Sequence, residues 1–389
     1  MEIKELTSSE FDSAIDLGEY AFNRAIPEQE RKERKADMEQ HKVLGYWEGD
    51  QLAAKLHIRP LEAFLGSKKI PFGGIAGVAT WPEFRRQGKV DELIREALRL
   101  MKGANQSISL LHPFSIGFYR RFGWEMTQYE HTYLFKPTDI EKRKAQCRTE
   151  RVKFSDMKPI LMDLYERKAQ QYGLTLARTE WWWEKRILTG DEQIVLFWND
   201  NREAEGYLIS RLEKAKLQVE EMVFFTESAF HGLLQWVRNH DSMIERVEMV
   251  SWPDEWIDFY LEGEKVDRKV HPYFMTRIVN VSDFLLQYPF FHPEISCSIG
   301  LSITDPCASW NEGKWSLDIK KGKVVEVLKK ENFEAPLKLE LSIQVLTAWL
   351  LGSQSIDALQ RMNQIKASGD KQVLPYLVKP LTPAFMDFF

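Results

Sequence analysis

The chain has 389 residues, which is enough for two or three domains of about 100–200 residues each. Hydrophobic residues make up 44% and charged residues 29%, an ordinary globular composition that excludes disordered, collagen-like and coiled-coil proteins; only the aromatic content is unusual, with 13 Trp and 23 Phe. The 53 Lys+Arg and 58 Asp+Glu give a formal net charge of −5 without basic blocks, which argues against a nucleic-acid partner and permits cationic or small-molecule ligands.

The cysteine content favours a reducing compartment. Cys147, Cys297 and Cys307 are odd in number and widely spaced, so they form no disulfide framework. The first residues are acidic where a signal peptide would be basic. The longest apolar stretch, residues 341–351, is shorter than the about 20 residues that a membrane span needs. We therefore expect a cytoplasmic protein with no membrane partner.

The first third of the chain predicts one α/β unit. A short strand and an amphipathic helix come first, followed by an antiparallel meander, a helix with one continuous apolar stripe, a strand, a short helix and a last strand. The predicted boundaries are a strand at 3–6, a helix from 8 to about 21, strands at 43–47, 52–65 and 70–81, a helix at 90–103, a strand at 107–112, a helix at 115–121 and a strand at 124–135.

The rest of the chain predicts two further units. A charged segment at 136–144 reads as a linker, after which a helix at 153–172 opens a second strand and helix alternation that runs to about 285. The two α/β units could be diverged copies, which one sequence does not decide. Beyond Pro289 the pattern becomes α+β, with strands at 295–303, 315–319 and 324–328 and helices at 341–351 and 355–364.

The segment from Val78 to Gly88 carries the clearest chemical signal. A strand ends in the basic turn Arg85-Arg86-Gln87-Gly88 and leads directly into a helix. Free amide groups at a helix start attract anions, glycine allows close approach of the backbone, and two arginines can bind a diphosphate. A solvated arginine pair at a helix start is the alternative, because Arg-x-x-Gly alone is a weak pattern.

This strand, turn and helix resemble the acetyl-coenzyme A motif of the GNAT superfamily of N-acetyltransferases. The usual second small residue of that motif is replaced here by Val90. Further matching segments are Gly117 to Trp124, the strand at Arg277 to Val281, and the ending Phe388-Phe389. With these, nearly the whole chain is similar to the enhanced intracellular survival (Eis) type of acetyltransferase.

The resemblance implies an α/β (α+β) fold with three domains. These are a GNAT acetyltransferase domain at 1–136 that binds acetyl-CoA, a second GNAT-like domain at 137–285 without the coenzyme motif, and a sterol-carrier-protein-like α+β domain at 286–389. It also implies a homo-oligomer, possibly a hexamer. The high aromatic content is compatible with large domain and subunit interfaces.

The resemblance also implies the site residues. The strand residues Val78, Ala79 and Thr80 would pair with the pantetheine arm, and Arg85, Arg86, Gln87 and Gly88 would hold the diphosphate. Tyr119 falls at the position of the general acid. The terminal carboxylate of Phe389 falls where the family brings the chain end into the first domain.

The two catalytic assignments have structural alternatives. A phenol with a pKa of about 10 can protonate a leaving thiolate, but Tyr119 could instead pack on Phe118 and Phe122. A terminal carboxylate with a pKa of about 3.5 is a weak base, so Phe389 could attract the amine or relay protons through water. A terminus is often disordered, but the apolar ending suggests docking, and Asp387 could add a second charge near the substrate.

Other clusters predict structure rather than chemistry. The run Trp181-Trp182-Trp183 after Thr179 is typical of core or interface packing at a helix start, with a substrate-stacking wall as the alternative. No metal site is expected, because the histidines, at 112, 131, 271 and 292 among others, lack metal-ligand spacing. His112 and Ser115 could line the pocket near Tyr119, although a satisfied histidine at a strand end is the alternative for His112. No serine or cysteine lies in a nucleophile-elbow context, which favours direct transfer over an acyl-enzyme.

The resemblance implies transfer of acetyl from acetyl-CoA, a co-substrate, to primary amines of a polycationic small molecule of aminoglycoside type. Acidic residues of the second unit are candidates for the pocket wall, although ordinary surface is the alternative for each: Glu220, Glu221, Glu245, Glu248, Asp254, Glu255 and Asp258. The alternative functions are a polyamine or protein-lysine acetyltransferase and a non-catalytic protein that binds a coenzyme or an apolar ligand.

Overall fold

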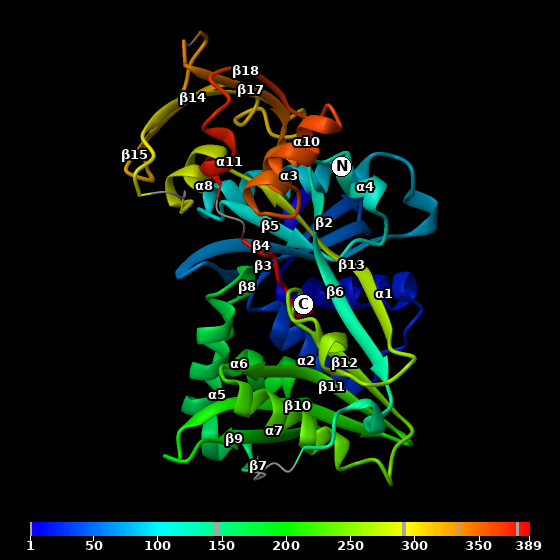
Figure 1. Ribbon diagram of the computed structural model, residues 1–389. Helices are drawn as coiled ribbons and strands as arrows, with labels where there is room; N and C mark the ends of the chain where they lie inside the picture. The colour runs from blue at the N-terminus through cyan, green and yellow to red at the C-terminus, as the bar shows by residue number, and fades with distance from the viewer. Residues whose placement is uncertain (1, 144–147, 290–292, 333, 379–380) are drawn as a thin grey trace.

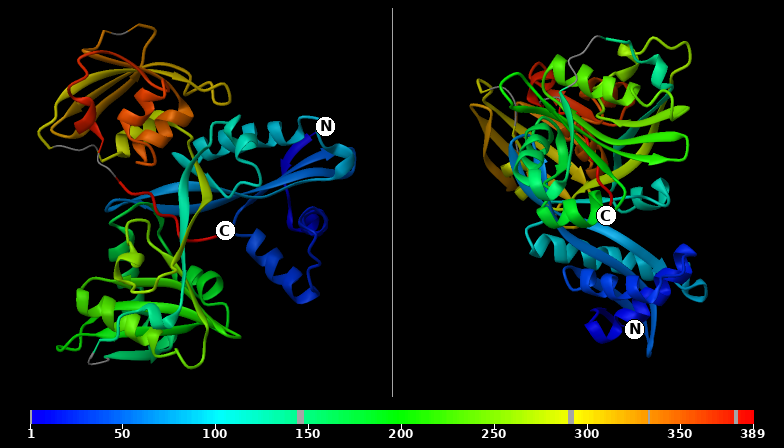
Figure 2. Two further views of the ribbon diagram at one scale, coloured as in Figure 1. Left: turned by 45° about the vertical axis from the view of Figure 1, so that its right-hand side comes forward. Right: turned by 90° about the horizontal axis from the view of Figure 1, so that it is seen from below.

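The computed structural model describes residues 2–143, 148–289, 293–332, 334–378 and 381–389; Cys147 and His292 lie outside the described residues. Three lobes surround a central region, into which the C-terminal segment runs from the third lobe (Figures 1 and 2). Within the described residues, none of the helices is both long and apolar enough to cross a membrane.

The first lobe follows the predicted order of elements with one addition. The helix α2 (Glu28–Met38) was not predicted, because this charged segment has only one buried residue, Met38. The apolar stripe predicted for α3 is buried on the sheet as expected. The elements are β1 (Glu2–Glu5), α1 (Phe11–Phe22), α2, β2 (Lys42–Glu48), β3 (Gln51–Leu65), β4 (Lys68–Thr80), α3 (Lys89–Gly103), β5 (Ile108–Leu111), α4 (Ile116–Arg120) and β6 (Glu125–Phe135).

The second lobe contains another strand and helix alternation. Its helix α5 is interrupted near Met157, just before the internal Pro159. The elements are β7 (Thr149–Val152), α5 (Phe154–Ala169), β8 (Gly173–Leu176), α6 (Glu180–Trp182), β9 (Gln193–Trp198), β10 (Ala204–Glu213), β11 (Lys216–Phe224), α7 (Glu227–Arg238), β12 (Arg246–Ser251), β13 (Asp267–Ile278) and α8 (Val281–Gln287).

The third lobe packs helices on its own five-stranded sheet, with strand order β16-β15-β14-β17-β18. Its apolar side chains join those of β13 and α8 in one core. The elements are β14 (Cys297–Thr304), β15 (Gly313–Lys320), β16 (Lys323–Lys329), β17 (Leu337–Ser342), α9 (Ile343–Leu350), α10 (Ile356–Arg361), β18 (Lys366–Gly369) and α11 (Leu374–Leu377).

The first two lobes share a single sheet of thirteen described strands. Its order is β1-β2-β3-β4-β5-β13-β6-β12-β11-β10-β9-β7, and β8 pairs with β3. Strand β13, which the sequence places in the second unit, lies between β5 and β6 of the first; Met275 pairs with both Leu111 and Met126. The two units are therefore joined through continuous backbone hydrogen bonding, which periodicity in a sequence does not reveal.

Candidate active site

The C-terminal end of β4 has an edge that no neighbouring strand of the described residues covers. Residues Phe72–Ile75 pair with β5, whereas the recorded strand partner of residues 76–80 is β3 alone. A bulge interrupts the β3 pairing here, because Gly77 and Val78 together lie opposite Leu56. Beyond Ile75, where β5 ends and β4 bulges, β4 and β5 are no longer paired. The predicted residues Val78, Ala79 and Thr80 therefore lie on a strand whose free edge can accept an added strand.

The turn after β4 is shaped to receive an anion. Arg85, Arg86, Gln87 and Gly88 are all exposed, and Gly88 forms the N-cap of α3 with φ +81° and no side-chain cap. A Cβ at Gly88 would meet no other atom within 4 Å, so the space before the first amides of α3 is open. A diphosphate fits there, since a helix start offers unpaired N–H groups.

Individual motif side chains differ in what they contact. The Nε of Arg85 donates to the Thr80 carbonyl at 3.3 Å and Nε2 of Gln87 donates to the Glu83 carbonyl at 2.8 Å, so both hold the turn itself. No recorded interaction engages the Arg86 side chain within the described residues. Sequence reasoning missed Lys89, which is buried, pairs with Glu48 and lies 4.7 Å from the ring centre of Tyr46.

Tyr119 lies in α4, just beyond the end of β5. It is 3% exposed, and its ring packs against Phe114, Phe118 and Trp124. The hydroxyl has no recorded hydrogen-bond partner among the described residues. It is not completely shielded from solvent. Burial raises the pKa of Tyr119, so the phenol keeps its proton at neutral pH.

Phe389 lies on β4 of the first lobe. Its ring is so close to Gly74 that a Cβ there would be 2.6 Å from the ring. It also contacts Phe72, Phe274 and Phe385, with ring centres 5.1 to 6.1 Å apart. Phe389 packs in the same hydrophobic core as Phe72, whereas Tyr119 packs in the core that contains Ile75 and the apolar side of α3. Because successive side chains of a strand point to opposite faces, Phe389 and Tyr119 lie on opposite faces of β4.

The segment that leads to Phe389 is held along β8. The Gly173 amide donates to the Thr382 carbonyl at 2.9 Å, and the Ala384 amide donates to the Gly173 carbonyl at 3.0 Å. The Thr175 hydroxyl donates to the Ala384 carbonyl at 2.9 Å, and the Phe385 amide donates to Oε1 of Gln128 at 3.0 Å. The docking suggested by the apolar ending is therefore present.

Asp387 does not face an open substrate region, contrary to the expectation that it could add a charge there. It is fully buried, and its Oδ1 accepts from Nε of Arg178 and from the Trp182 indole, both at 2.8 Å. Arg178 also pairs with Glu221 at 2.6 Å. Burial raises the pKa of Asp387, while Arg178 opposes the increase. The carboxylate thus anchors the C-terminal segment to the second lobe.

The other predicted clusters take different places. Thr179 caps α6, with Trp182 and Trp183 buried and Trp181 partly exposed, as packing predicts. The His112 ring lies 5.2 Å from that of Phe388, at the docked chain end, and Ser115 caps α4. Within the described part of the chain, no group of three or more His, Cys, Asp and Glu could hold a metal ion.

The acidic candidates do not form one wall. Glu221 is buried on Arg178, and Glu248 pairs with Lys216 at 2.7 Å. Glu220 lies 3.4 Å from Arg211, and Glu245 carries no recorded side-chain contact among the described residues. Asp254, Glu255 and Asp258 line a pocket of the second lobe whose lining includes neither the β4 turn nor Phe389.

Three family models match consecutive parts of the chain. Residues 2–127 match an acetyltransferase (GNAT) domain, residues 174–278 match a second acetyltransferase (GNAT) domain, and residues 281–385 match a sterol carrier protein domain. The chain is a tandem GNAT acetyltransferase. The predicted fold class, two GNAT domains followed by a sterol-carrier-like domain, is confirmed, as is the prediction of an enzyme of GNAT type.

Solved structures share the whole arrangement. A conserved Enterococcus faecalis protein described as a probable N-acyltransferase is 26% identical, with a TM-score of 0.91 over 100% of this chain and 99% of that one. A GCN5-related N-acetyltransferase from Anabaena variabilis is 23% identical, with a TM-score of 0.87 over 100% of both chains. Eis1 from Mycobacterium abscessus is 16% identical, with a TM-score of 0.81 over 100% of both chains.

No curated protein matches the sequence. The likeness to Eis1 is one of fold, because the identity is low. The GNAT domain implies that the tandem GNAT protein uses acetyl-CoA, and the open β4 edge with the turn before α3 fits that molecule. The catalytic and coenzyme-binding roles of single residues stay predictions.

Proposed function

We propose that the tandem GNAT protein is an Eis-type enzyme that transfers acetyl from acetyl-CoA directly to primary amines of a polycationic small molecule of aminoglycoside type. The observation that supports this most is the docking of Phe389 on β4 at Gly74, beside the open edge at residues 76–80. The sequence resemblance to the Eis type supplies the acceptor class.

Acetyl-CoA supplies an activated acyl group in its thioester. Val78, Ala79 and Thr80 would hold its extended arm at the free edge of β4, and Arg85, Arg86, Gln87 and Gly88 would surround its diphosphate. The arm would then run inward from the turn towards Gly77, so the reacting end would lie between Tyr119 on one face and Phe389 on the other.

Tyr119 would act as the general acid. Its buried phenol keeps a proton that it can give to the departing sulfur. The Phe389 carboxylate makes no recorded ion pair with the described residues, so it is free to attract a cationic amine and to take a proton directly or through water. Direct attack by the amine needs no nucleophilic side chain of the chain itself.

An acceptor panel tests this function. Release of free thiol from acetyl-CoA should be fastest with tobramycin, slower with spermidine and slowest with a lysine-containing peptide. Faster release with spermidine or the peptide would favour the alternative polyamine or protein-lysine acetyltransferase. No release above background with any amine would contradict the proposed transfer.

Two variants test the catalytic roles. Tyr119→Phe and a short tag after Phe389 should each lower kcat by about 100-fold, the usual size of an acid or base contribution. Tyr376→Phe, an exposed tyrosine of the third lobe, and a tag before residue 1 are the matched controls. Unchanged turnover in both test variants would contradict the assigned roles while leaving acetyl transfer itself in place.

We also propose that the protein is cytoplasmic and forms a homo-oligomer, possibly a hexamer. Its aromatic content supports extensive interfaces. Light scattering of the purified chain during size-exclusion chromatography measures the assembly directly, and a monomer at micromolar concentration would contradict it.

A further inference from the structure

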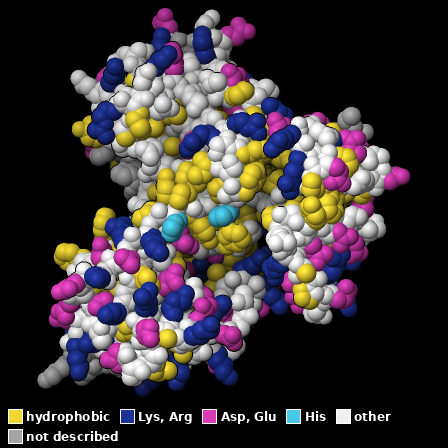
Figure 3. Space-filling model, turned by 90° about the vertical axis from the view of Figure 1, so that its right-hand side faces the viewer, with side chains coloured by type: hydrophobic (Ala, Val, Ile, Leu, Met, Phe, Trp, Pro, Cys, Tyr) yellow, Lys and Arg dark blue, Asp and Glu magenta, His cyan; other side chains and the backbone are white. Residues whose placement is uncertain are grey.

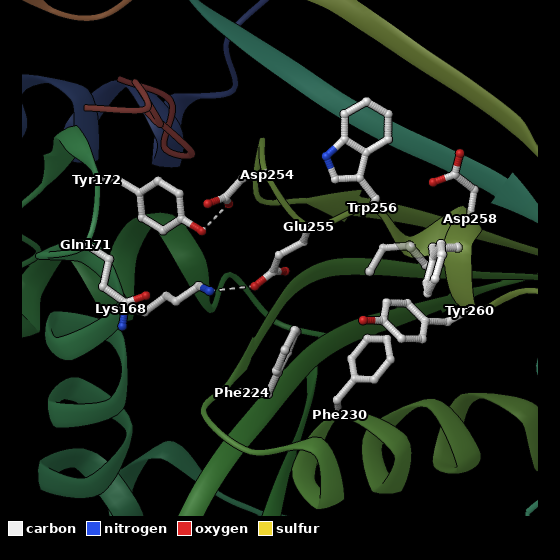
Figure 4. Close-up of a pocket in the computed structure, with 12 residues that line it drawn as sticks. Lys168, Gln171, Tyr172, Phe224, Phe230, Asp254, Glu255, Trp256, Asp258 and Tyr260 are labelled. Carbon is white, nitrogen blue, oxygen red and sulfur yellow. Dashed lines mark hydrogen bonds and ion pairs between the residues drawn. The ribbon is translucent and has the colours of Figure 1, made fainter. Parts of the chain in front are cut away.

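A pocket of about 680 Å³ lies in the second GNAT domain (Figure 4). Its walls are the end of α5, strand β11, helix α7 and the loop that follows β12. The residues around it are Lys168, Gln171, Tyr172, Phe224, Phe230 and the segment 254–260. None of the residues predicted for coenzyme binding or catalysis lines it, so the transfer site does not account for it.

Negative charge predominates in this pocket, with three carboxylates and one lysine. Lys168 is paired with Glu255 at 2.5 Å, and both side chains are largely buried. Asp254 accepts a hydrogen bond from the Tyr172 hydroxyl at 2.5 Å, and Asp258 accepts one from the Tyr133 hydroxyl at 3.3 Å. Neither aspartate has a recorded cationic partner among the described residues. These two carboxylates take part in no ion pair of the described residues, although the Arg268 guanidinium lies beside them on the Trp256 ring, so the pair attracts a further cation.

Aromatic rings surround these carboxylates. Trp256, Phe259 and Tyr260 are 56%, 82% and 45% exposed, although large aromatic side chains are costly to leave in water. Tyr260 meets the buried Phe230 at 4.7 Å between ring centres. Figure 4 shows Asp254 and Asp258 on different sides of the group, with Trp256 between them.

The rings of this region already hold cations of the chain itself. The Lys168 ammonium lies 5.3 Å from the ring centre of Phe224 and 5.4 Å from that of Tyr172. The Arg268 guanidinium lies 3.9 Å from the ring centre of Trp256. Such distances are typical of cation–π attraction, which adds to the attraction of a nearby carboxylate.

We propose that this pocket binds a small organic cation with two or more positive charges, of the polyamine type. One ammonium group would lie at Asp254 and another at Asp258, with the intervening carbon chain against Trp256 and Tyr260. The ligand stays unchanged at this site, which is separate from the transfer site and does not depend on the proposed acetyl transfer.

Calorimetric titration of the full chain with spermidine, without acetyl-CoA, tests the site. Asp258→Asn, which removes a charge contact, and Trp256→Leu, which removes the ring beside the carbon chain, should each weaken one saturable binding event by about tenfold. Asp241→Asn and Trp181→Leu are matched controls, being an exposed aspartate and a partly exposed tryptophan of the same domain outside the pocket. Triethylene glycol, a neutral chain, should not bind.

Two results would overturn the proposal. One is the absence of saturable spermidine binding, or binding that is equal in the wild type and both pocket variants. The other is a change of oligomeric state in Trp256→Leu, which would make the exposed rings a contact with a second copy of the chain. Because acetyl-CoA is absent, a failure of acetyl transfer leaves this test unaffected.

Discussion

Lys55 is a buried lysine that forms no ion pair with a carboxylate of the described residues. It is 5% exposed, and its Nζ lies 3.0 Å from Nε2 of His57, whose Nδ1 lies 2.8 Å from Nε2 of His41. Burial, aided by Arg34, lowers the pKa of Lys55 to about 7. Desolvation also lowers the pKa of His57, and it lowers that of His41 to about 4. At neutral pH the two imidazoles are therefore uncharged, and Lys55 is only partly protonated.

Lys55 makes the stability of the protein depend on pH. Its pKa is about 7 when folded and 10.5 when unfolded, so the unfolded chain binds the extra proton between these values. The free energy of unfolding therefore rises as pH increases from about 7 to about 10. Lys55→Met should stabilise the protein by up to about 5 kcal/mol at pH 6, and this gain should shrink towards pH 10.

Urea unfolding of the wild type and of Lys55→Met at several pH values measures this difference. Lys69→Met, which removes an exposed lysine paired with Glu166, should change the free energy of unfolding by less than about 1 kcal/mol at any pH. A constant difference between wild type and Lys55→Met from pH 6 to pH 10 would contradict the assignment.

At the scale of elements, β8 and the C-terminal segment behave as one unit. The bonds from Gly173 and Thr175 hold residues 382–384, and the buried Arg178 then fixes Asp387, two residues before Phe389. Arg178 also stacks on Tyr165 at 3.9 Å from the ring centre. The second domain thus positions the chain end that lies on β4 of the first.

Replacing Asp387 should loosen this unit. Asp387→Leu removes one of the two buried carboxylates on Arg178 and the partner of the Trp182 indole, so we expect a loss of about 3 kcal/mol of stability. The kcat of acetyl transfer should fall while the acetyl-CoA dissociation constant stays within about twofold. Chemical denaturation and coenzyme titration measure both, with the exposed-pair variant Glu166→Gln as control. A parallel loss of coenzyme affinity would contradict a role confined to the chain end.

Local elements could be predicted from the sequence because their signals are local. The apolar stripe of α3, the turns of the β2 to β4 meander and the Thr179 cap each depend on neighbouring residues. The charged α2 lacks such a stripe, so it was missed. The pairing of Arg178 with Asp387 joins residues far apart in the chain, and no sequence pattern marks it. The acidic candidates at 254–258 were found by composition, but their pocket depends on rings from several elements.

At the scale of the whole molecule, a buried ion pair ties the third lobe to the first. Arg277 of β13 pairs with Asp305 at 2.6 Å, and both are buried. The same guanidinium donates to the Phe122 carbonyl, just after α4, the helix that carries Tyr119. Figure 3 shows hydrophobic side chains gathered in the hollow between the lobes. Arg277 therefore links the third lobe to the part of the first lobe that carries Tyr119.

Loss of this pair should uncouple the lobes. Arg277→Met leaves Asp305 buried without its cation, so a destabilisation of about 3–5 kcal/mol is expected. Differential scanning calorimetry should then resolve a separate transition for the third lobe, where the wild type melts in fewer steps. Arg99→Met breaks only an exposed pair with Glu96 and should leave the trace unchanged. An identical trace for Arg277→Met would contradict the coupling.

The position of β13 between β5 and β6 also sets constraints on the order of folding. Leu111 and Met126 find their strand partner at Met275, in a segment that is synthesised much later. Contacts so distant in sequence form slowly, because the intervening loop must close first. Until then the nascent chain exposes the facing edges of β5 and β6, which are open to pairing with other chains. Chaperone demand and the aggregation of shortened fragments should therefore centre on these two edges.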